Sequence, residues 1–129
     1  MTQKPSTKTL MVTNFEHYTE ELDEIDLAII PIIIKAFKKY TKDNPIKAPE
    51  IVSKFNENRL TLNYPRKLSE PKLRKICNFI RSNGLLPLIA TSNGYYVSYQ
   101  KEEIQEMVKS LRERANAINR SAEGLAMFL

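Results

Sequence analysis

The 129-residue sequence predicts a mainly α-helical protein with one small β-hairpin, an α+β fold. Apolar residues recur at i, i+3, i+4 and i+7 in several segments, which is the spacing of an amphipathic helix. Asn93-Gly94 lies between two β-prone runs, Leu86 to Ala90 and Tyr95 to Tyr99, and Asn-Gly in such a place is a strong hairpin signal. Isoleucine or leucine then recurs every seven residues from Ile104 to Leu125, which predicts a long final helix.

The charge is segregated along the chain, although the formal net charge is only +5. Residues 14–26 carry six acidic and no basic side chains, whereas residues 35–81 carry 13 Lys or Arg against 4 Asp or Glu, a net of +9. Residues 100–129 carry five of each sign. We therefore expect three parts: an N-terminal arm over 1–14 that is flexible, a basic domain over 15–99, and a C-terminal helix over 100–129.

The first helix is expected to begin near Thr19, a suitable N-cap, with acidic residues in its first turn. Those acidic residues, Glu20 to Asp26, favour the positive end of the helix dipole. We prefer this explanation of the acidic cluster to a cation-binding site. The apolar body runs to Tyr40, and Pro31 interrupts it. Pro31 must either kink the helix or separate a short leading helix from a main one.

A second, short helix is predicted over Ala48 to Asn58, after the turn-forming segment 41–47 that contains Asp-Asn-Pro. Pro49 suits the first turn of this helix. The connection that follows, 56–67, alternates apolar and polar residues around Leu60 to Tyr64. It is either a brief strand pairing with the hairpin or a connecting loop.

The third helix is predicted to begin after the N-cap Ser69 and to end at Asn83-Gly84, where glycine adopts the left-handed conformation at little cost. Its apolar face includes Cys77, the only cysteine, which we expect in the core. Arg and Lys pair with guanine and Asn with adenine in the major groove. The polar face supplies the candidate base-reading residues, Lys72, Arg74, Lys75, Asn78 and Ser82.

The order helix, short helix, basic helix, hairpin is that of a winged helix-turn-helix domain, in which the third helix enters the major groove. The connection before the third helix, about ten residues, exceeds the 3–4 residues of the tight motif. The stretch LSEPKLRKICNFIRSNGLLPLIATSNGYYVS also resembles small winged-helix proteins of bacteriophages and prophages, with their basic helix ending in Ile-Arg, their Leu-x-Pro exit and their Gly-Tyr-Tyr wing. The resemblance covers about 25–99 and continues through 110–115. It implies a DNA-binding fold and a regulator of transcription or replication in a mobile element.

Further residues are candidates for phosphate contacts. Arg66 and Lys67 precede the third helix, which would be the DNA-reading helix, and Arg81 lies near its end. The hairpin tip offers hydrogen-bond donors but no Arg or Lys to probe a narrow minor groove, so the wing either touches phosphates or is purely architectural. The tip residues concerned are Thr91, Ser92 and Asn93. The neighbouring tyrosines 95, 96 and 99 are expected to pack in the hairpin rather than to stack on bases.

The final helix presents its seven-residue repeat to another helix, either within the same chain or in a second chain. If it folds back, it covers the domain's own first helix. If it pairs with a second copy, the homodimer presents two reading helices to a two-fold site. Dimerisation is slightly favoured, because a terminal Ala-Met-Phe-Leu left in water is costly.

Several other classes of protein are disfavoured. His17 and Cys77 are the only residues of their kinds, so a zinc site is not expected, and no catalytic motif, cofactor-binding loop or small-molecule substrate is apparent. The N-terminus lacks a signal-peptide core, and the longest apolar run has eight residues, which predicts a cytoplasmic protein with no membrane partner. The resemblance implies that the cell is a bacterial or phage-infected one. The sequence therefore favours double-stranded DNA binding. The alternatives are a protein-interaction module that docks through its C-terminal helix, and single-strand binding through the tyrosines.

Overall fold

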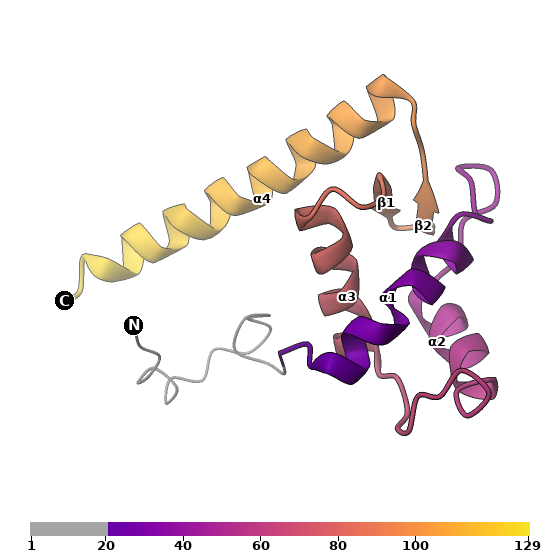
Figure 1. Cartoon of the computed structure of the whole chain (residues 1–129). Helices are drawn as coiled ribbons and strands as arrows, with labels where there is room; N and C mark the ends of the chain where they lie inside the picture. Colours follow the sequence, from indigo (N-terminus) through magenta and orange to yellow (C-terminus); the bar gives the residue numbers. More distant parts are fainter. Residues whose placement is uncertain (1–20) are drawn as a thin grey trace.

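A computed structural model, which describes residues 21–129, shows an α+β architecture (Figure 1). Its elements in order are α1 (Glu24–Phe37), α2 (Ala48–Glu57), α3 (Glu70–Ser82), β1 (Leu88–Thr91), β2 (Gly94–Val97) and α4 (Lys101–Ala126). Helices α1 to α3 and the hairpin enclose the main core, and α4 runs away from them as a long rod. The predicted flexible arm, the expected cap Thr19 and His17 all lie outside the described residues.

Helix α1 is a single helix that contains Pro31, so the separate leading helix considered from the sequence is not present within its bounds. It begins at Glu24, so the start expected near Thr19 is wrong. The reason is a capping box that makes Asp23 the N-cap: the Asp23 side chain accepts from the Asp26 N–H at 2.9 Å, and the Asp26 side chain accepts from the Asp23 N–H at 3.1 Å. Pro31 removes one backbone donor, but it lies on the exposed side, where water can bond to the carbonyl that loses its partner. The buried residues Ile30 and Ile33 hold the helix on the core across this position.

The predicted boundaries of the next two helices are confirmed to within one residue. Helix α2 has Pro49 in its first turn. Helix α3 is capped by Ser69, whose Oγ accepts a hydrogen bond from the Lys72 N–H at 3.2 Å. It ends before Gly84, whose φ of +62° is the left-handed conformation that glycine adopts without strain. These features confirm the expected cap and the expected stop, both of which depend only on neighbouring residues.

The connection between α2 and α3 forms turns, so the strand considered around Leu60 to Tyr64 is absent and the loop alternative is correct. The extra pairing partner of the hairpin is instead Ile46, between α1 and α2. The Ile46 N–H donates to the Tyr95 carbonyl at 2.9 Å, and the Tyr95 N–H donates to the Ile46 carbonyl at 2.7 Å. A Cβ atom on Gly94 would lie 2.6 Å from the Ile46 carbonyl oxygen, so this close approach requires glycine.

The hairpin is antiparallel with the register Leu88↔Val97, Ile89↔Tyr96, Ala90↔Tyr95 and Thr91↔Gly94. Its two faces have different partners because alternate residues of a strand point in opposite directions. Leu88 and Tyr95 face the main core, where the Tyr95 ring lies 5.5 Å from that of Phe37. Ile89 and Tyr96 form a second apolar cluster with Met107 of α4. The hairpin is therefore enclosed between the three-helix body and the start of α4.

Helix α4 contacts the rest of the described chain only near its beginning. Met107 is buried on the hairpin, and Lys42 forms an ion pair with Glu103 at 3.5 Å. Ser98 also donates a short hydrogen bond to Glu103. Every residue from Val108 onward is exposed. Helix α4 therefore does not fold back along α1, and the sequence alternative that required this is wrong. Among residues 21–129, no helix combines the length and apolarity that a transmembrane span requires.

Candidate nucleic-acid interface

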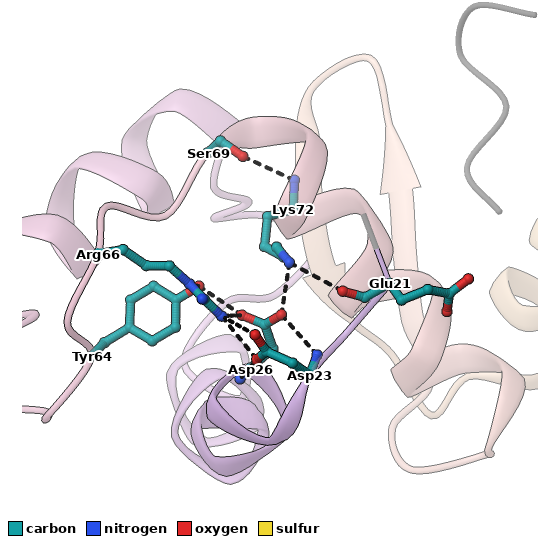
Figure 2. Close-up of polar contacts among 7 residues, drawn as sticks. All are labelled: Glu21, Asp23, Asp26, Tyr64, Arg66, Ser69 and Lys72. Atoms are coloured by element: carbon teal, nitrogen blue, oxygen red, sulfur yellow. Dashed lines mark hydrogen bonds and ion pairs between the residues drawn. The ribbon is translucent and has the colours of Figure 1, made fainter. Parts of the chain in front are cut away.

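The beginnings of α1 and α3 are joined by a polar cluster centred on Asp26, whose side chain is fully buried (Figure 2). The Lys72 Nζ donates to Asp26 Oδ2 at 2.7 Å, and the Tyr64 hydroxyl donates to Oδ1 at 2.7 Å. Arg66 Nη2 donates to the same Oδ1 and also to both carboxylate oxygens of Asp23, each at 2.8 Å. One buried carboxylate therefore receives three side-chain donors from the segment 64–72, and it fixes α3 against α1.

These contacts determine the ionisation of the cluster. Burial by itself would raise the pKa of Asp26, but the hydrogen bonds from Lys72, Tyr64 and Arg66 outweigh it and hold that pKa well below its ordinary value. The pKa of Asp23 is also lowered, first by the backbone hydrogen bond from Asp26 and then by Arg66. Hydrogen bonds to Tyr64, Asp23 and Asp26 raise the pKa of Arg66 above its ordinary value. The cluster is thus a set of ionised, mutually neutralising groups.

The structure contradicts the expectation that Lys72 lies on the outward face of α3. Only 8% of this residue is exposed, and its charge is paired with Asp26. The sequence contained one signal for this arrangement, because Asp26 falls in the spacing of the buried residues Ile29, Ile30 and Ile33 of α1. A carboxylate on an apolar helix face requires a buried cation, and Lys72 supplies it. No periodicity within α3 identifies Lys72 as that cation.

The two cations before α3 also differ from the expectation of open phosphate contacts. Arg66 is exposed on the surface, but its guanidinium is paired with Asp23 and Asp26 and lies over the Tyr64 ring, 5.3 Å from the centroid. Lys67 is exposed beside this cluster and lines a hollow that Glu21 and Asp23 also line. The acidic start of α1 therefore lies next to both cations.

Arg81, expected near a phosphate, instead holds the hairpin. Its Nε donates to the Leu88 carbonyl at 3.0 Å, and its Nη2 atom is buried. The guanidinium therefore connects the last turn of α3 to the first residue of β1. Its role in the described structure is to fix the orientation of the hairpin relative to α3.

The remaining candidates on α3 do form one continuous polar face. At 100° per residue, Asn78 and Ser82 lie near the middle of this face, Arg74 on the hairpin side and Lys75 on the α1 side. Arg74 and Ser82 are exposed, and Lys75 and Asn78 are half-buried. Neither Arg74 nor Lys75 forms an ion pair with a carboxylate of residues 21–129.

This face is not a bare convex surface. Lys75, Asn78 and Ser82 line an open hollow of about 450 Å³ whose opposite wall includes Leu22 and Leu27. The hollow lies where the polar face of α3 meets the start of α1. Arg74 does not line this hollow and lies on the hairpin side of α3. Burial raises the pKa of Tyr95, and the positive charges of Arg81 and Arg74 partly oppose that increase.

At the hairpin tip, the Thr91 hydroxyl accepts from the Asn93 N–H at 3.1 Å and donates to the Gly94 carbonyl at 3.3 Å, so it stabilises the turn. Ser92 and Asn93 are exposed. Of the three tyrosines, Tyr96 is buried and Tyr95 is half-buried, with its pKa raised to about 12 by burial, whereas Tyr99 is 74% exposed. The packing of Tyr95 and Tyr96 leaves no platform of three tyrosines for stacking on bases.

No group of three or more His, Cys, Asp or Glu in residues 21–129 is placed to hold a metal ion. Comparison of the chain with protein-family models, with curated proteins and with solved structures gives no match. The geometry of α3, the hairpin and α4 therefore carries the functional inference.

Proposed function

We propose that the chain is a double-stranded DNA-binding protein of the winged-helix class, with α3 as its reading helix. The observation that carries the proposal is the polar face of α3, where Arg74 and Lys75 flank Asn78 and Ser82 without a carboxylate partner among the described residues. Two nearby cations have such partners, so Lys72 is excluded from the base-reading residues and Arg66 from the open phosphate contacts. The chemistry that remains, one Arg, one Lys and one Asn on one helix face, suits base edges in a major groove.

The arrangement of the elements supports the class. The order α1, bridge at Ile46, α2, α3, β1, β2 places a short extended segment between the first two helices and pairs it with the hairpin. In a winged helix the third helix and the wing face the duplex together. Arg81 ties the end of α3 to β1, which fixes the exposed tip residues Ser92 and Asn93 relative to the polar face.

Binding to phosphates releases counterions, so affinity must fall with salt concentration. We propose that the chain acts on DNA as a regulator of transcription or replication in a mobile element, the role that its sequence resemblance implies. The exposed basic side chains give the duplex its initial attraction, and the base contacts of α3 give the preference for one site. Protein–DNA hydrogen bonds from Ser82 and the wing would add orientation rather than sequence information.

The test is fluorescence anisotropy with a pool of labelled genomic duplexes at about 50 and 200 mM salt, concentrations between which phosphate-binding proteins lose affinity steeply. The double variant Arg74→Ala/Lys75→Ala should bind at least about tenfold more weakly, since one good base contact contributes ~1–3 kcal/mol. The matched control is Lys109→Ala/Arg120→Ala, which removes the same charges from exposed positions of α4. The proposal is abandoned if the wild-type chain shifts no duplex at low salt, or if the control loses as much affinity as the test variant.

A second function, protein interaction, is favoured by one specific observation. Helix α4 exposes large apolar side chains along its length, including Ile118 at 58% and Leu125 at 71%. If docking of another protein were the main activity, the substitution Leu111→Glu in α4 would abolish it, and the α3 variant would leave it intact. Protein interaction would be the main activity if the α3 variant still bound a partner protein and the wild-type chain showed no affinity for DNA.

A further inference from the structure

Helix α4 carries a continuous apolar stripe after it leaves the body. Starting at Ile104, steps of four and three residues reach only apolar side chains as far as the C-terminus. The stripe consists of Ile104, Val108, Leu111, Ala115, Ile118, Ala122, Leu125 and Leu129. From these residues we infer that α4 pairs with α4 of a second copy of this chain, side by side and antiparallel, in a two-helix coiled coil over residues 108–125. This inference is independent of DNA binding.

The body partly covers the first residue of this stripe, Ile104, which packs against the cluster of Ile89, Tyr96 and Met107, and it leaves the stripe open from Val108 onward. Met107 points to the hairpin and is 8% exposed, whereas Val108 and Leu111 are 39% and 37% exposed, and the exposed fraction increases further along the helix. Nineteen residues, 108–126, thus form a helix whose apolar side has no partner in the described chain. Isolated helices of this length are marginal in water, and helices in proteins are stabilised mainly by packing of their apolar face. A stable α4 therefore requires a partner.

The shape of the stripe selects a helix as that partner. Only two residues in seven belong to it, which is the narrow seam of a coiled coil rather than the broader apolar face of a helix lying on a globular surface. The strict seven-residue repeat matches a left-handed supercoil. A flat groove or a lipid surface would favour a wider apolar face with Lys and Arg on the other side, whereas the other side of α4 carries both signs, for example Lys109 and Glu113.

The charges permit the partner to be a second copy. Residues 100–129 carry five basic and five acidic side chains, so two copies have no net repulsion. The two arginines next to the stripe, Arg112 and Arg114, would lie opposite Asn119 and Ser121 of the second copy in the antiparallel arrangement. Neither contact places like charges together.

Side-chain size selects the antiparallel orientation. In that arrangement Val108 faces Leu125 of the second copy, Leu111 faces Ala122, and Ala115 faces Ile118, so a large residue meets a smaller one in every layer. A parallel pair would instead stack Ala115 on Ala115 and Ala122 on Ala122, next to layers with two isoleucines or two leucines. Alternation of large and small residues across facing positions fills such a seam, whereas paired alanines leave gaps.

The C-terminal residues fit the same orientation. Met127, Phe128 and Leu129 are the most exposed apolar residues of the described chain, at 86%, 88% and 105%. In the antiparallel pair they reach the beginning of the second copy's α4. The apolar side chains available there are Ile104, which is half-buried, and Tyr99, which is 74% exposed. Both ends of the coiled coil would therefore be covered by the same contact.

Orientation is tested by cross-linking with introduced cysteines in the full chain. Val108→Cys alone and Leu125→Cys alone should give no disulfide-linked dimer on mild oxidation, because equivalent residues lie far apart in an antiparallel pair. An equimolar mixture of the two variants should give the dimer. The wild-type chain is the control, since its own Cys77 is buried. A strong cross-link in the Val108→Cys sample alone would establish a parallel pair and overturn the inference.

Stoichiometry is tested by sedimentation equilibrium. The wild-type chain should show twice the 14.9 kDa chain mass, and Leu111→Glu/Ile118→Glu should halve it while the circular dichroism of the body is retained. The control Lys109→Glu/Arg120→Glu places two glutamates on the side of α4 away from the stripe and should remain dimeric. The inference of an antiparallel α4 pair would also be overturned if the wild-type mass were that of one chain at all concentrations up to about 100 μM, or that of three or four chains.

Discussion

At the scale of single residues, Asp26 has the largest influence on the candidate interface. Its carboxylate is fully buried, and it accepts hydrogen bonds from Lys72, Tyr64 and Arg66. Ion pairs of this kind contribute little net stability compared with apolar packing, but removal of one partner leaves a charge buried without compensation. Asp26 pairs with Lys72 and, together with Asp23, with Arg66, so these two cations are engaged within the protein. Arg74 and Lys75 form no ion pair with a carboxylate of residues 21–129.

The buried carboxylate makes stability depend on pH. Because the folded pKa of Asp26 lies below its unfolded value of about 3.9, its contribution is present above that pH and is lost as the pH falls. Asp26→Asn should lower the free energy of unfolding by about 3–5 kcal/mol at pH 7. The difference from wild type should shrink at pH 3, as measured by urea unfolding. The control Asp43→Asn, at an exposed turn, should change the free energy of unfolding by less than about 0.5 kcal/mol at pH 7. An Asp26→Asn difference that grows toward pH 3 would contradict the assignment.

The structural role of Lys72 can be separated from the proposed reading role of its neighbours. Lys72→Met keeps the apolar stem but removes the partner of Asp26, so it should lower the urea midpoint clearly. Its DNA affinity, measured on the folded protein, should change by less than about twofold, the opposite of the behaviour expected for Arg74→Ala/Lys75→Ala. If Lys72→Met lost as much DNA affinity as the double variant, Lys72 would have to be counted among the residues that contact DNA.

At the scale of elements, the hairpin depends on contacts from three separate segments. Ile46 bonds to Tyr95, Arg81 bonds to Leu88, and Met107 packs on Ile89. A two-stranded hairpin is marginal by itself, so these contacts stabilise it and give it a defined orientation. Since its outer face is covered by α4, only the tip around Ser92 and Asn93 is available for a duplex.

Glycine substitutions test the attachment of the hairpin. Gly94→Ala forces a Cβ against the Ile46 carbonyl, 2.6 Å away, at a φ of +127°, so it should destabilise the protein by about 1–3 kcal/mol or more. Gly124→Ala lies in open space within α4 and should instead stabilise by roughly 0.5–1 kcal/mol. Thermal unfolding of the two variants gives the comparison. Equal midpoints would show that the approach of Ile46 to Gly94 is not a real constraint.

At the scale of the assembly, the protein is a small basic body attached to one end of a helical rod (Figure 1). The 26 residues of α4 extend about 39 Å at ~1.5 Å per residue. Antiparallel pairing would place the two bodies at opposite ends of the pair rather than side by side. Two copies of α3 would then be available to one long duplex or to two separate ones.

This assembly predicts a dependence on DNA length that combines both proposals. The wild-type dimer should bind a duplex that contains two sites at least about tenfold more tightly than a duplex with one site, because the second contact is intramolecular. Leu111→Glu/Ile118→Glu should bind the single site as well as wild type but lose this advantage. Anisotropy titrations with the two duplexes measure both effects, and an unchanged advantage in the variant would show that α4 does not link the two reading helices.

The sequence by itself determined the type, order and boundaries of most elements, because these follow from local physics. Ser69 caps α3, Gly84 ends it, Asn93-Gly94 marks the hairpin, and the seven-residue repeat gives α4. Each of these signals acts over a few residues. The general α+β architecture was therefore predictable, and the winged-helix assignment and its DNA-binding role remain proposals.

Only the tertiary structure decided which side chains are available. Lys72 and Arg66 were expected to face a ligand, but they pair with Asp26, which lies 46 and 40 residues earlier in the chain. Ile46, not the segment around Leu62, pairs with the hairpin. Met107 turns to the hairpin and leaves Val108 in the open stripe. Charge and periodicity describe one segment at a time, whereas burial and ion pairing depend on segments distant in sequence that folding brings together.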